Sequence, residues 1–526
     1  MVSIPETDLD SFVDDLSLAT KVGQLFVYVH SGAPETTDHL DRSFLREYRP
    51  GGVIVYPYSV TGRDQIAGYL ADLQGLNEEL GLPGPMLVTA DHRGGDYTIL
   101  QPGAGGLEFP APMAQTAIDD DLDAVGREIG AAIARDALDV GFNLNLAPYA
   151  DFLERGDIEG FFFGNSMMGS DPERNAALAR GLTEGMASEG LGTTYCDFPG
   201  GYGSLDADPH FATGSVDVDE ATLRERFLGA PRAAIEAGVD AVMLSHWSFP
   251  AIDDDPATYS EPVIEGLLRD DLGFDGLVMT DAIGMAGAAE PAGGSEEAAI
   301  RAVEAGVDII LCADWAERRA VERAVREGRI SEGRIDEAVR RVLELKRSVA
   351  DTDGDARDGP LAADRGRMAD RVEQSLTWAH RPDDWESLAG DDVLALSTSR
   401  TFLDAVGSVS GRSVRLRELP EDNPVEDVDL DTRLDHFEHV SAGDERVLVG
   451  TASIDDLAFA SALAERGRDV TAVHAGFVFD PQEIEPVPPL LLSYSSQPIA
   501  CETAAAVVFG DSEADGQLPV DLALGE

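Results

Sequence analysis

Lysine is almost missing from this chain of 526 residues, in which Lys21 and Lys346 are the two lysines among 39 basic residues. The 99 acidic residues therefore leave a formal net charge of -60. Such a chain repels polyanions, and binding nucleic acid would require a clustered basic surface that this composition makes scarce. We expect no nucleic acid partner. An acidic, lysine-poor surface is instead typical of proteins from extreme halophiles, in which high salt screens the repulsion.

Cysteines and long apolar runs are also scarce. Cys196, Cys312 and Cys501 are far apart and odd in number, which favours free thiols in a reduced, cytoplasmic protein over a disulfide framework. The first residues lack the basic and apolar regions of a secretory signal, and no apolar run is long enough to span a membrane, so we expect no membrane partner. The nine histidines include no HxH or HExxH spacing. We therefore assign no metal and no cofactor.

Short apolar runs alternate with amphipathic helical stretches, which predicts an α/β fold that begins with a (β/α)8 TIM-type barrel over residues 1–350. The loss of apolar periodicity after it predicts a linker over 351–380, and further strand-like runs predict a smaller α/β sandwich domain over 381–526. The predicted barrel strands are Gln24–Val29, Gly52–Tyr56, Met86–Thr89, Phe142–Leu146, Thr193–Cys196, Ala241–Leu244, Gly276–Thr280 and Val307–Leu311. Those of the second domain are Val393–Ser397, Val414–Leu419, Arg446–Gly450, Val470–His474 and Leu490–Tyr494.

Acidic residues follow most of the predicted barrel strands. In such a barrel the chemistry takes place at the carboxyl ends of the strands. An acid at that place can also serve as the cap of the next helix, and for each residue taken alone both interpretations stay open. The predicted ring at the strand ends is Asp91, Asp151, Asp197, His246, Asp281 and Asp314.

Asp281 is the leading candidate for a reactive carboxylate, because the segment GFDGLVMTDAIGM runs a buried apolar strand directly into it. About seventy residues earlier, Asp208 and His210 form an Asp-Pro-His loop, which sets a carboxylate beside an imidazole that titrates near neutrality. This combination predicts a nucleophile with a separate acid/base pair. The alternative for the loop is an Asx turn with an exposed histidine.

A series of motifs extends over the predicted barrel. They are KVGQLF from Lys21, GGVIVY from Gly51, NLNLAPYADF from Asn143, GSDPER from Gly169, AVMLSHWSFPAIDDDPATYSEP from Ala241, LLRDDLGFDGLVMTDAIGM from Leu267 and AIRAVEAGVDIIL from Ala299. In order and spacing this series resembles glycoside hydrolase family three, and most closely its β-N-acetylglucosaminidase branch. The resemblance implies a retaining glycosidase with a carbohydrate substrate. It assigns the covalent nucleophile to Asp281 and the acid/base to His210, which Asp208 would hold in position.

The chain departs from the family pattern where the sugar is held. The family's Lys-His-Phe-Pro-Gly-His-Gly corresponds here to Cys196–Gly203, which lacks the lysine and both histidines, and its Asp-x-Glu-Gly-Gly corresponds to Asp91–Gly95, where arginine replaces glutamate. Each lost charge-assisted donor is worth about 1.5–3 kcal/mol of binding. We expect the altered pocket to bind its substrate through Asp91, Arg93, Asp197, His246 and Met285. The charges of Arg93 and Asp197 are expected to lie within reach of each other or of a common ligand.

The sequence thus predicts a β-glycosidase of the β-N-acetylhexosaminidase type. Two alternatives stay open at this point. One is a catalytically weak or inactive sugar-binding homologue, and the other is a β-glucosidase or phosphorylase of altered specificity. The sequence predicts neither the sugar, nor the aglycone, nor the oligomeric state.

The charge leads to a prediction about salt. If salt relieves repulsion among the 99 acidic side chains, the unfolding temperature should rise steeply between dilute buffer and molar potassium chloride. Thermal unfolding followed by circular dichroism across this range measures the effect. An unfolding temperature independent of salt would contradict the halophilic interpretation.

Overall fold

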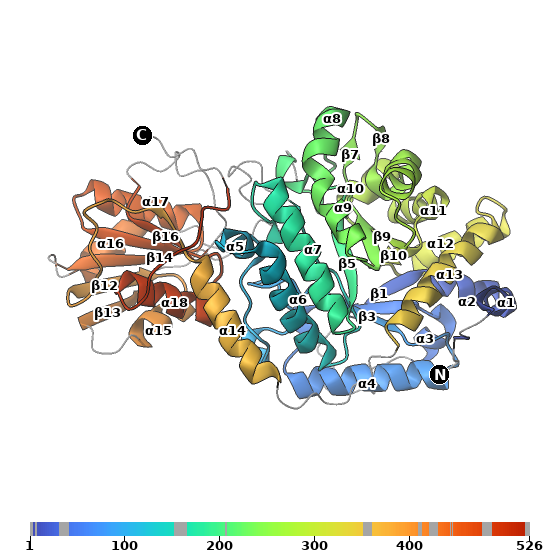
Figure 1. The fold of residues 1–526 in the computed structure, drawn as a ribbon, viewed down its shortest axis with the longest axis horizontal. Helices are drawn as coiled ribbons and strands as arrows, with labels where there is room; N and C mark the ends of the chain where they lie inside the picture. The colour runs from blue at the N-terminus through green and yellow to red at the C-terminus, as the bar shows by residue number, and fades with distance from the viewer. Residues whose placement is uncertain are drawn as a thin grey trace.

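The structure is a computed structural model that describes residues 4–5, 8–30, 42–151, 166–205, 208–350, 360–408, 413–419, 430–441, 443, 445–475 and 487–520. Its larger part is a closed barrel of eight strands surrounded by helices (Figure 1). The strands follow the order β1-β10-β9-β6-β5-β4-β3-β2, and parallel pairing of β1 with both β2 and β10 closes the ring. The predicted α/β barrel is therefore confirmed.

Each predicted barrel run overlaps one observed strand. The strands are short and buried, as expected for parallel strands covered by helices. They are β1 (Phe26–His30), β2 (Gly52–Val55), β3 (Leu87–Ala90), β4 (Leu144–Asn145), β5 (Gly192–Phe198), β6 (Ala241–Leu244), β9 (Leu277–Ala282) and β10 (Ile309–Leu311). A small ribbon of β7 (Ser248–Phe249) and β8 (Asp253–Pro256) lies between β6 and β9 in the sequence.

The helices of the barrel connect its strands and cover its outside (Figure 1). They are α1 (Leu9–Asp15), α2 (Leu18–Gln24), α3 (Arg42–Tyr48), α4 (Arg63–Glu79), α5 (Pro112–Ala117), α6 (Leu122–Leu138), α7 (Pro172–Ser188), α8 (Glu220–Thr222), α9 (Gly229–Glu236), α10 (Ala286–Ala292), α11 (Ser295–Ala305), α12 (Trp315–Arg326) and α13 (Glu332–Ser348). Because the strands are parallel, their carboxyl ends meet at one mouth of the barrel, where the predicted acids are located.

A six-stranded sheet follows, in the order β11-β16-β15-β14-β12-β13, with β11 antiparallel to its neighbour and the other pairs parallel. Alternate residues of β12 face opposite sides: Val393 and Ala395 pack with α15 and α18, and Leu394 and Leu396 with α16 and α17. Helices therefore cover both faces of the sheet. Its elements are β11 (Thr377–His380), β12 (Asp392–Ser397), α15 (Arg400–Ser408), β13 (Ser413–Glu418), α16 (Leu430–Val440), β14 (Arg446–Thr451), α17 (Ile454–Glu465), β15 (Val470–His474), β16 (Leu490–Leu492) and α18 (Pro498–Val508).

The range predicted as a linker, 351–380, contains regular structure. Residues 351–359 lie outside the described residues, whereas α14 (Pro360–Ser375) and β11 occupy most of the remainder. Helix α14 packs beside α5 and α6 (Figure 1). Arg135 of α6 donates two hydrogen bonds to the buried Asp364 of α14, at 2.8 and 2.7 Å. This ion pair fixes the helix against the barrel.

Lys346 is buried at the amino ends of the barrel strands. Its Nζ donates to Gln24 Oε1 at 2.7 Å and to the Pro83 carbonyl at 3.2 Å, and its side chain is fully buried. Burial lowers the pKa of Lys346 from its ordinary value of 10.5 to about 7. The unfolded chain therefore binds a proton between these two pH values that the folded chain does not bind.

This difference predicts a pH dependence of stability. As the pH rises from 7 to 10, the Lys346 contribution should raise the free energy of unfolding by up to about 1.4 kcal/mol per pH unit, and below pH 7 it should be constant. Lys346→Met should remove that part of the slope. Denaturant unfolding of both proteins at several pH values gives the two slopes. Equal slopes in the parent and the variant would contradict the low pKa.

Candidate active site

A pocket of about 560 Å³ opens at the carboxyl ends of the barrel strands. It brings together six of the eight predicted site residues, namely Asp91, Arg93, Asp197, His210, Asp281 and Met285. Much of the rest of its wall is apolar or aromatic. The aromatic and methionine side chains are Tyr56, Tyr58, Tyr97, Tyr149, Met243 and Met285.

Asp208 holds the pocket histidine by its Nδ1 nitrogen. The distance from His210 Nδ1 to Asp208 Oδ1 is 2.6 Å, and the His210 backbone N–H donates to the same oxygen at 2.9 Å. The Tyr202 hydroxyl donates to the other oxygen at 3.1 Å. Since Nδ1 is committed to the carboxylate, proton exchange with a bound molecule falls to Nε2. The Asp-Pro-His loop therefore is an Asx turn, as the alternative interpretation expected, but its histidine is paired with the Asp208 carboxylate and is only partly exposed.

Asp281 lies near the end of β9 and lines the pocket. Its Oδ1 accepts a hydrogen bond from the Ala282 N–H at 2.6 Å. The Ala282 carbonyl in turn faces His246 Nε2 at 3.0 Å, and His246 Nδ1 lies 2.5 Å from the Thr258 hydroxyl. Burial lowers the pKa of His246. His246 Nε2 donates to the Ala282 carbonyl, and the Thr258 hydroxyl beside Nδ1 donates its own hydrogen to the Ser245 carbonyl at 2.7 Å.

His246 does not line the pocket, although sequence reasoning placed it among the substrate-binding residues. The ring is buried and both of its nitrogens have protein partners. The structure thus places it behind Asp281, where it fixes the backbone that follows this residue.

Arg93 forms an ion pair with the neighbouring strand-end acid. Its Nη2 lies 2.5 Å from Asp91 Oδ1, its Nε donates to the Leu146 carbonyl at 3.1 Å, and its guanidinium carbon lies 4.3 Å from the centre of the Tyr149 ring. Burial raises the pKa of Asp91 and the charge of Arg93 opposes that rise. Arg93 and Asp197 line the same pocket and attract each other, as expected, and Asp91 is an ion-pair partner of Arg93.

The turn that presents Arg93 depends on glycine. Gly94 has a φ of +108°, and a Cβ there would lie 2.4 Å from the Pro110 carbonyl oxygen. The turn also carries Asp96 to the pocket wall. The six-stranded sheet contributes the partners of Asp96, since the Ser495 and Ser496 hydroxyls each donate to its Oδ1 at 3.1 Å.

Asp197, at the end of β5, is the most enclosed acid of the pocket. Its exposed fraction is 4%, and its Oδ1 has no hydrogen-bond partner among the described residues. Burial and then the charge of Asp281 raise the pKa of Asp197 well above its usual value, whereas Arg93 and the Tyr149 hydroxyl act in the opposite direction.

The remaining acids of the predicted ring have structural roles. Asp314 caps α12 by accepting from the Ala316 N–H at 3.0 Å, in a capping box with Glu317. Asp151 accepts from the backbone N–H groups of Gly201 and Tyr202 at 2.9 and 2.5 Å, which fastens the loop after β5. The helix-cap interpretation was therefore right for Asp314.

Sequence reasoning missed most of the aromatic wall. Tyr56 follows β2, and its hydroxyl lies 3.2 Å from Cys312 Sγ. Tyr58 stacks on Tyr56, with ring centres 5.6 Å apart, and remains 63% exposed. Tyr56 and Tyr58 both lie within three positions of the end of β2, and this is the signal that could have identified them.

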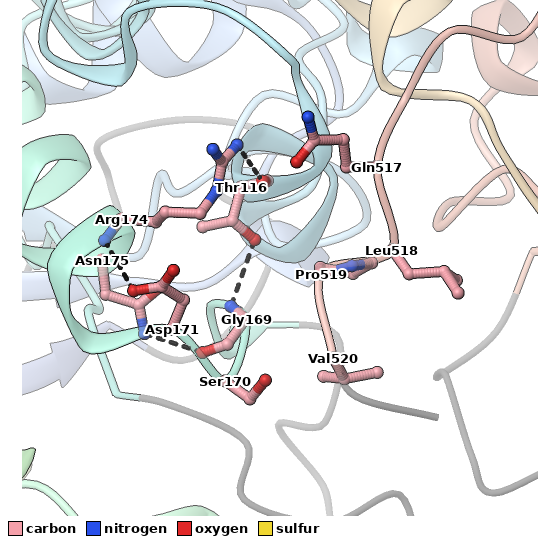
Figure 2. A pocket seen from close by; sticks show the side chains of 10 residues that line it. All are labelled: Thr116, Gly169, Ser170, Asp171, Arg174, Asn175, Gln517, Leu518, Pro519 and Val520. Carbon is pink, nitrogen blue, oxygen red and sulfur yellow. Dashed lines mark hydrogen bonds between the residues drawn. The ribbon is translucent and has the colours of Figure 1, made fainter. Parts of the chain in front are cut away.

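A second pocket, of about 350 Å³, lies between the start of α7 and the segment Gln517–Val520 (Figure 2). Asp171 there is the cap of α7, and Arg174 donates to the Thr116 carbonyl at 2.9 Å. The polar groups of this pocket thus serve helix capping and chain packing. Its lining contains no histidine and a single acid, so it offers no nucleophile with a separate acid/base.

Within the part of the chain that the structure describes, no three His, Cys, Asp or Glu side chains cluster as metal ligands would. None of the helices in the same residues is long and apolar enough to cross a membrane.

Comparisons with known proteins agree on one family. Residues 17–345 match the Glycosyl hydrolase family 3 N terminal domain. A β-hexosaminidase of Stenotrophomonas maltophilia (strain K279a) is 32% identical over 276 residues, which cover 52% of this chain and 78% of that protein. A β-hexosaminidase of Idiomarina loihiensis is 27% identical over 277 residues, which cover 52% of this chain and 80% of that protein.

Solved structures extend the similarity to nearly the whole chain. The glycoside hydrolase family 3 β-N-acetylglucosaminidase from Paenibacillus sp. str. FPU-7 is 28% identical, with a TM-score of 0.86 over 97% of this chain and 100% of that one. A β-glucoside phosphorylase has a TM-score of 0.78 at 18% identity, which is a likeness of fold alone.

The Arg93 ion pair leads to a prediction about stability. Arg93→Ala should lower the free energy of unfolding by about 3 kcal/mol, because it leaves the Asp91 charge without its partner. This is the lower end of the range for a buried pair, since the Asp91 side chain keeps 26% exposure. The double variant Arg93→Ala/Asp91→Asn should recover at least about 1 kcal/mol of that loss. Denaturant unfolding of the three proteins measures both changes, and a double variant no more stable than Arg93→Ala would contradict the charge argument.

Proposed function

Because the chain belongs to glycosyl hydrolase family 3, we propose that it cleaves β-hexosaminides through a covalent glycosyl-enzyme formed on Asp281. It is a glycoside hydrolase of the β-hexosaminidase type. The observation that carries the assignment of residues is that Asp281 and the histidine paired with Asp208 open onto one pocket.

In the first step, Asp281 attacks the anomeric carbon while the bond to the leaving oxygen breaks. His210 Nε2 gives its proton to that oxygen, and Asp208 stabilises the ring in the required tautomer through Nδ1. In the second step, neutral His210 takes a proton from water, which attacks the anomeric carbon and releases Asp281. Two displacements return the sugar with its original β configuration.

His246 supports the reaction as a positioning residue. Its bond to the Ala282 carbonyl fixes the peptide whose N–H donates to Asp281. The Ala282 N–H bond fixes the orientation of the Asp281 carboxylate. Asp91, Arg93, Asp197 and Met285 are proposed to contact the sugar, because all four line the pocket.

The organisation of the rest of the chain is part of the same proposal. Residues 1–350 would form the catalytic domain and the six-stranded sheet a second domain, with α14 and β11 taking most of the range first interpreted as a linker. The high acidic charge supports function in high salt. Three free cysteines support a reducing, cytoplasmic location.

Removal of the nucleophile is the first test. Asp281→Asn should lower the turnover of aryl β-hexosaminides by at least about a thousandfold, because the amide is nearly isosteric with the carboxylate and is not a nucleophile. The parent and the variant are assayed in molar potassium chloride, with the unfolding temperature as a check on the fold. Turnover of the variant within about tenfold of the parent would remove Asp281 from this role.

The second test concerns His210. His210→Ala should reduce cleavage of substrates with poor leaving groups far more than that of nitrophenyl glycosides, because nitrophenolate leaves with little protonation. Asp208→Asn is the matched control. It should affect the same substrates in the same order but less severely, since the histidine remains. Equal losses on both kinds of substrate would rule out the acid role.

A further inference from the structure

Asp197 is a buried acceptor on the pocket wall, and one of its two carboxylate oxygens has no donor among the described residues. It lies on β5 beside the proposed nucleophile, its exposed fraction is 4%, and its Oδ1 accepts no hydrogen bond from any described residue. Buried carboxylate oxygens are almost always hydrogen-bonded in proteins. An oxygen of this kind on the wall of a ligand pocket is therefore expected to receive its donor from the ligand.

The charges around Asp197 limit what that donor can be. Asp281 approaches from β9, Asp151 from the loop after β4, and Arg93 from the turn after β3. The guanidinium of Arg93 is already paired with Asp91 at 2.5 Å. Burial and the charge of Asp281 accordingly raise the pKa of Asp197, although Arg93 lies close enough to lower it. Arg93 therefore does not offset the effect of burial and of Asp281 on Asp197.

A ligand could supply a hydroxyl, an amide N–H or an ammonium group to Asp197. All three can donate a hydrogen bond to Oδ1, but only the ammonium brings the positive charge that would let Asp197 ionise beside Asp281. The site also carries a carboxylate where the resemblance to the family leads one to expect a histidine. A charge-assisted bond from an ammonium is about twice as strong as a neutral one.

We infer that this pocket prefers a β-hexosaminide whose amino group is free and protonated, with the ammonium bound by Asp197. The inference rests on the proposed function, because it names the substrate class of the same site. Arg93 does not prevent binding of a cation, since Asp91 neutralises it and the Tyr149 ring, 4.3 Å away, helps to fix its position. The acetylated sugar lacks the charge and becomes the poorer substrate.

The experiment compares aryl β-glycosides of glucosamine, N-acetylglucosamine and glucose in molar potassium chloride. We expect kcat/KM to be at least about tenfold higher for the glucosaminide than for either other substrate. Asp197→Asn should lower kcat/KM for the glucosaminide by at least about tenfold and for the N-acetylglucosaminide by less than about threefold. The matched control is Asp96→Asn, which removes another pocket carboxylate, one that already accepts from Ser495 and Ser496. It should leave the ratio of the two kcat/KM values unchanged.

Inhibition of the parent enzyme by free sugars gives a second measurement that needs no variant. Glucosamine should inhibit at a concentration at least about tenfold lower than N-acetylglucosamine. A preference for the acetylated substrate and inhibitor, or an equal effect of Asp197→Asn on both substrates, would overturn the inference and leave the glycosidase intact. Absence of turnover on all three glycosides would instead refute the proposed function. Calorimetric binding of glucosamine that is lost in Asp197→Asn would still support the ammonium site in that case.

Discussion

Among the described residues, the carboxylates at the mouth of this barrel depend on the guanidinium of Arg93. Asp91, Asp197 and Asp281 end three of its strands and line one pocket, and Arg93 is the cation among them. Its bond to Asp91 leaves two carboxylates that share a poorly solvated space. The charge of Asp281 raises the pKa of Asp197, and a donor on a bound ligand would act in the opposite direction. The different roles that we propose for Asp281 and Asp197 follow from that constraint.

The surrounding structure holds the charges in place from three directions. Gly94 allows the tight turn that carries Arg93, and Asp151 fastens the loop that follows Asp197. From the six-stranded sheet, Ser495 and Ser496 bind Asp96 on the wall of the pocket. Through these two serines, the part of the chain that contains the sheet stabilises one side of the barrel mouth. Such positioning matters because a site tolerates little displacement of its reacting groups.

Much of this arrangement could be predicted from local sequence, and some could not. The eight barrel strands were predictable because each is a short apolar run between amphipathic helices. The roles proposed for Asp281 and His210 were predicted from a strand end, an Asp-Pro-His spacing and the resemblance to glycoside hydrolase family three. The burial of His246 depends on Thr258 and on the Ala282 carbonyl, which local patterns do not bring together. Strand β11 has four residues and pairs with β16 more than a hundred positions later, and short runs of this kind carry little periodic signal.

The acids of this chain differ less in sequence context than in how many donors reach them. Asp314 is satisfied by the backbone of the helix it caps, and Asp208 by an imidazole, a backbone N–H and a tyrosine hydroxyl. Asp197 retains an oxygen that no described residue reaches. In a protein with so many acidic residues, the mere presence of an aspartate at a strand end says little about function. A buried acceptor that still lacks a donor is a better indicator of a binding site. Leaving such an oxygen unsatisfied costs free energy on folding, and a ligand that donates a hydrogen bond to it removes that cost.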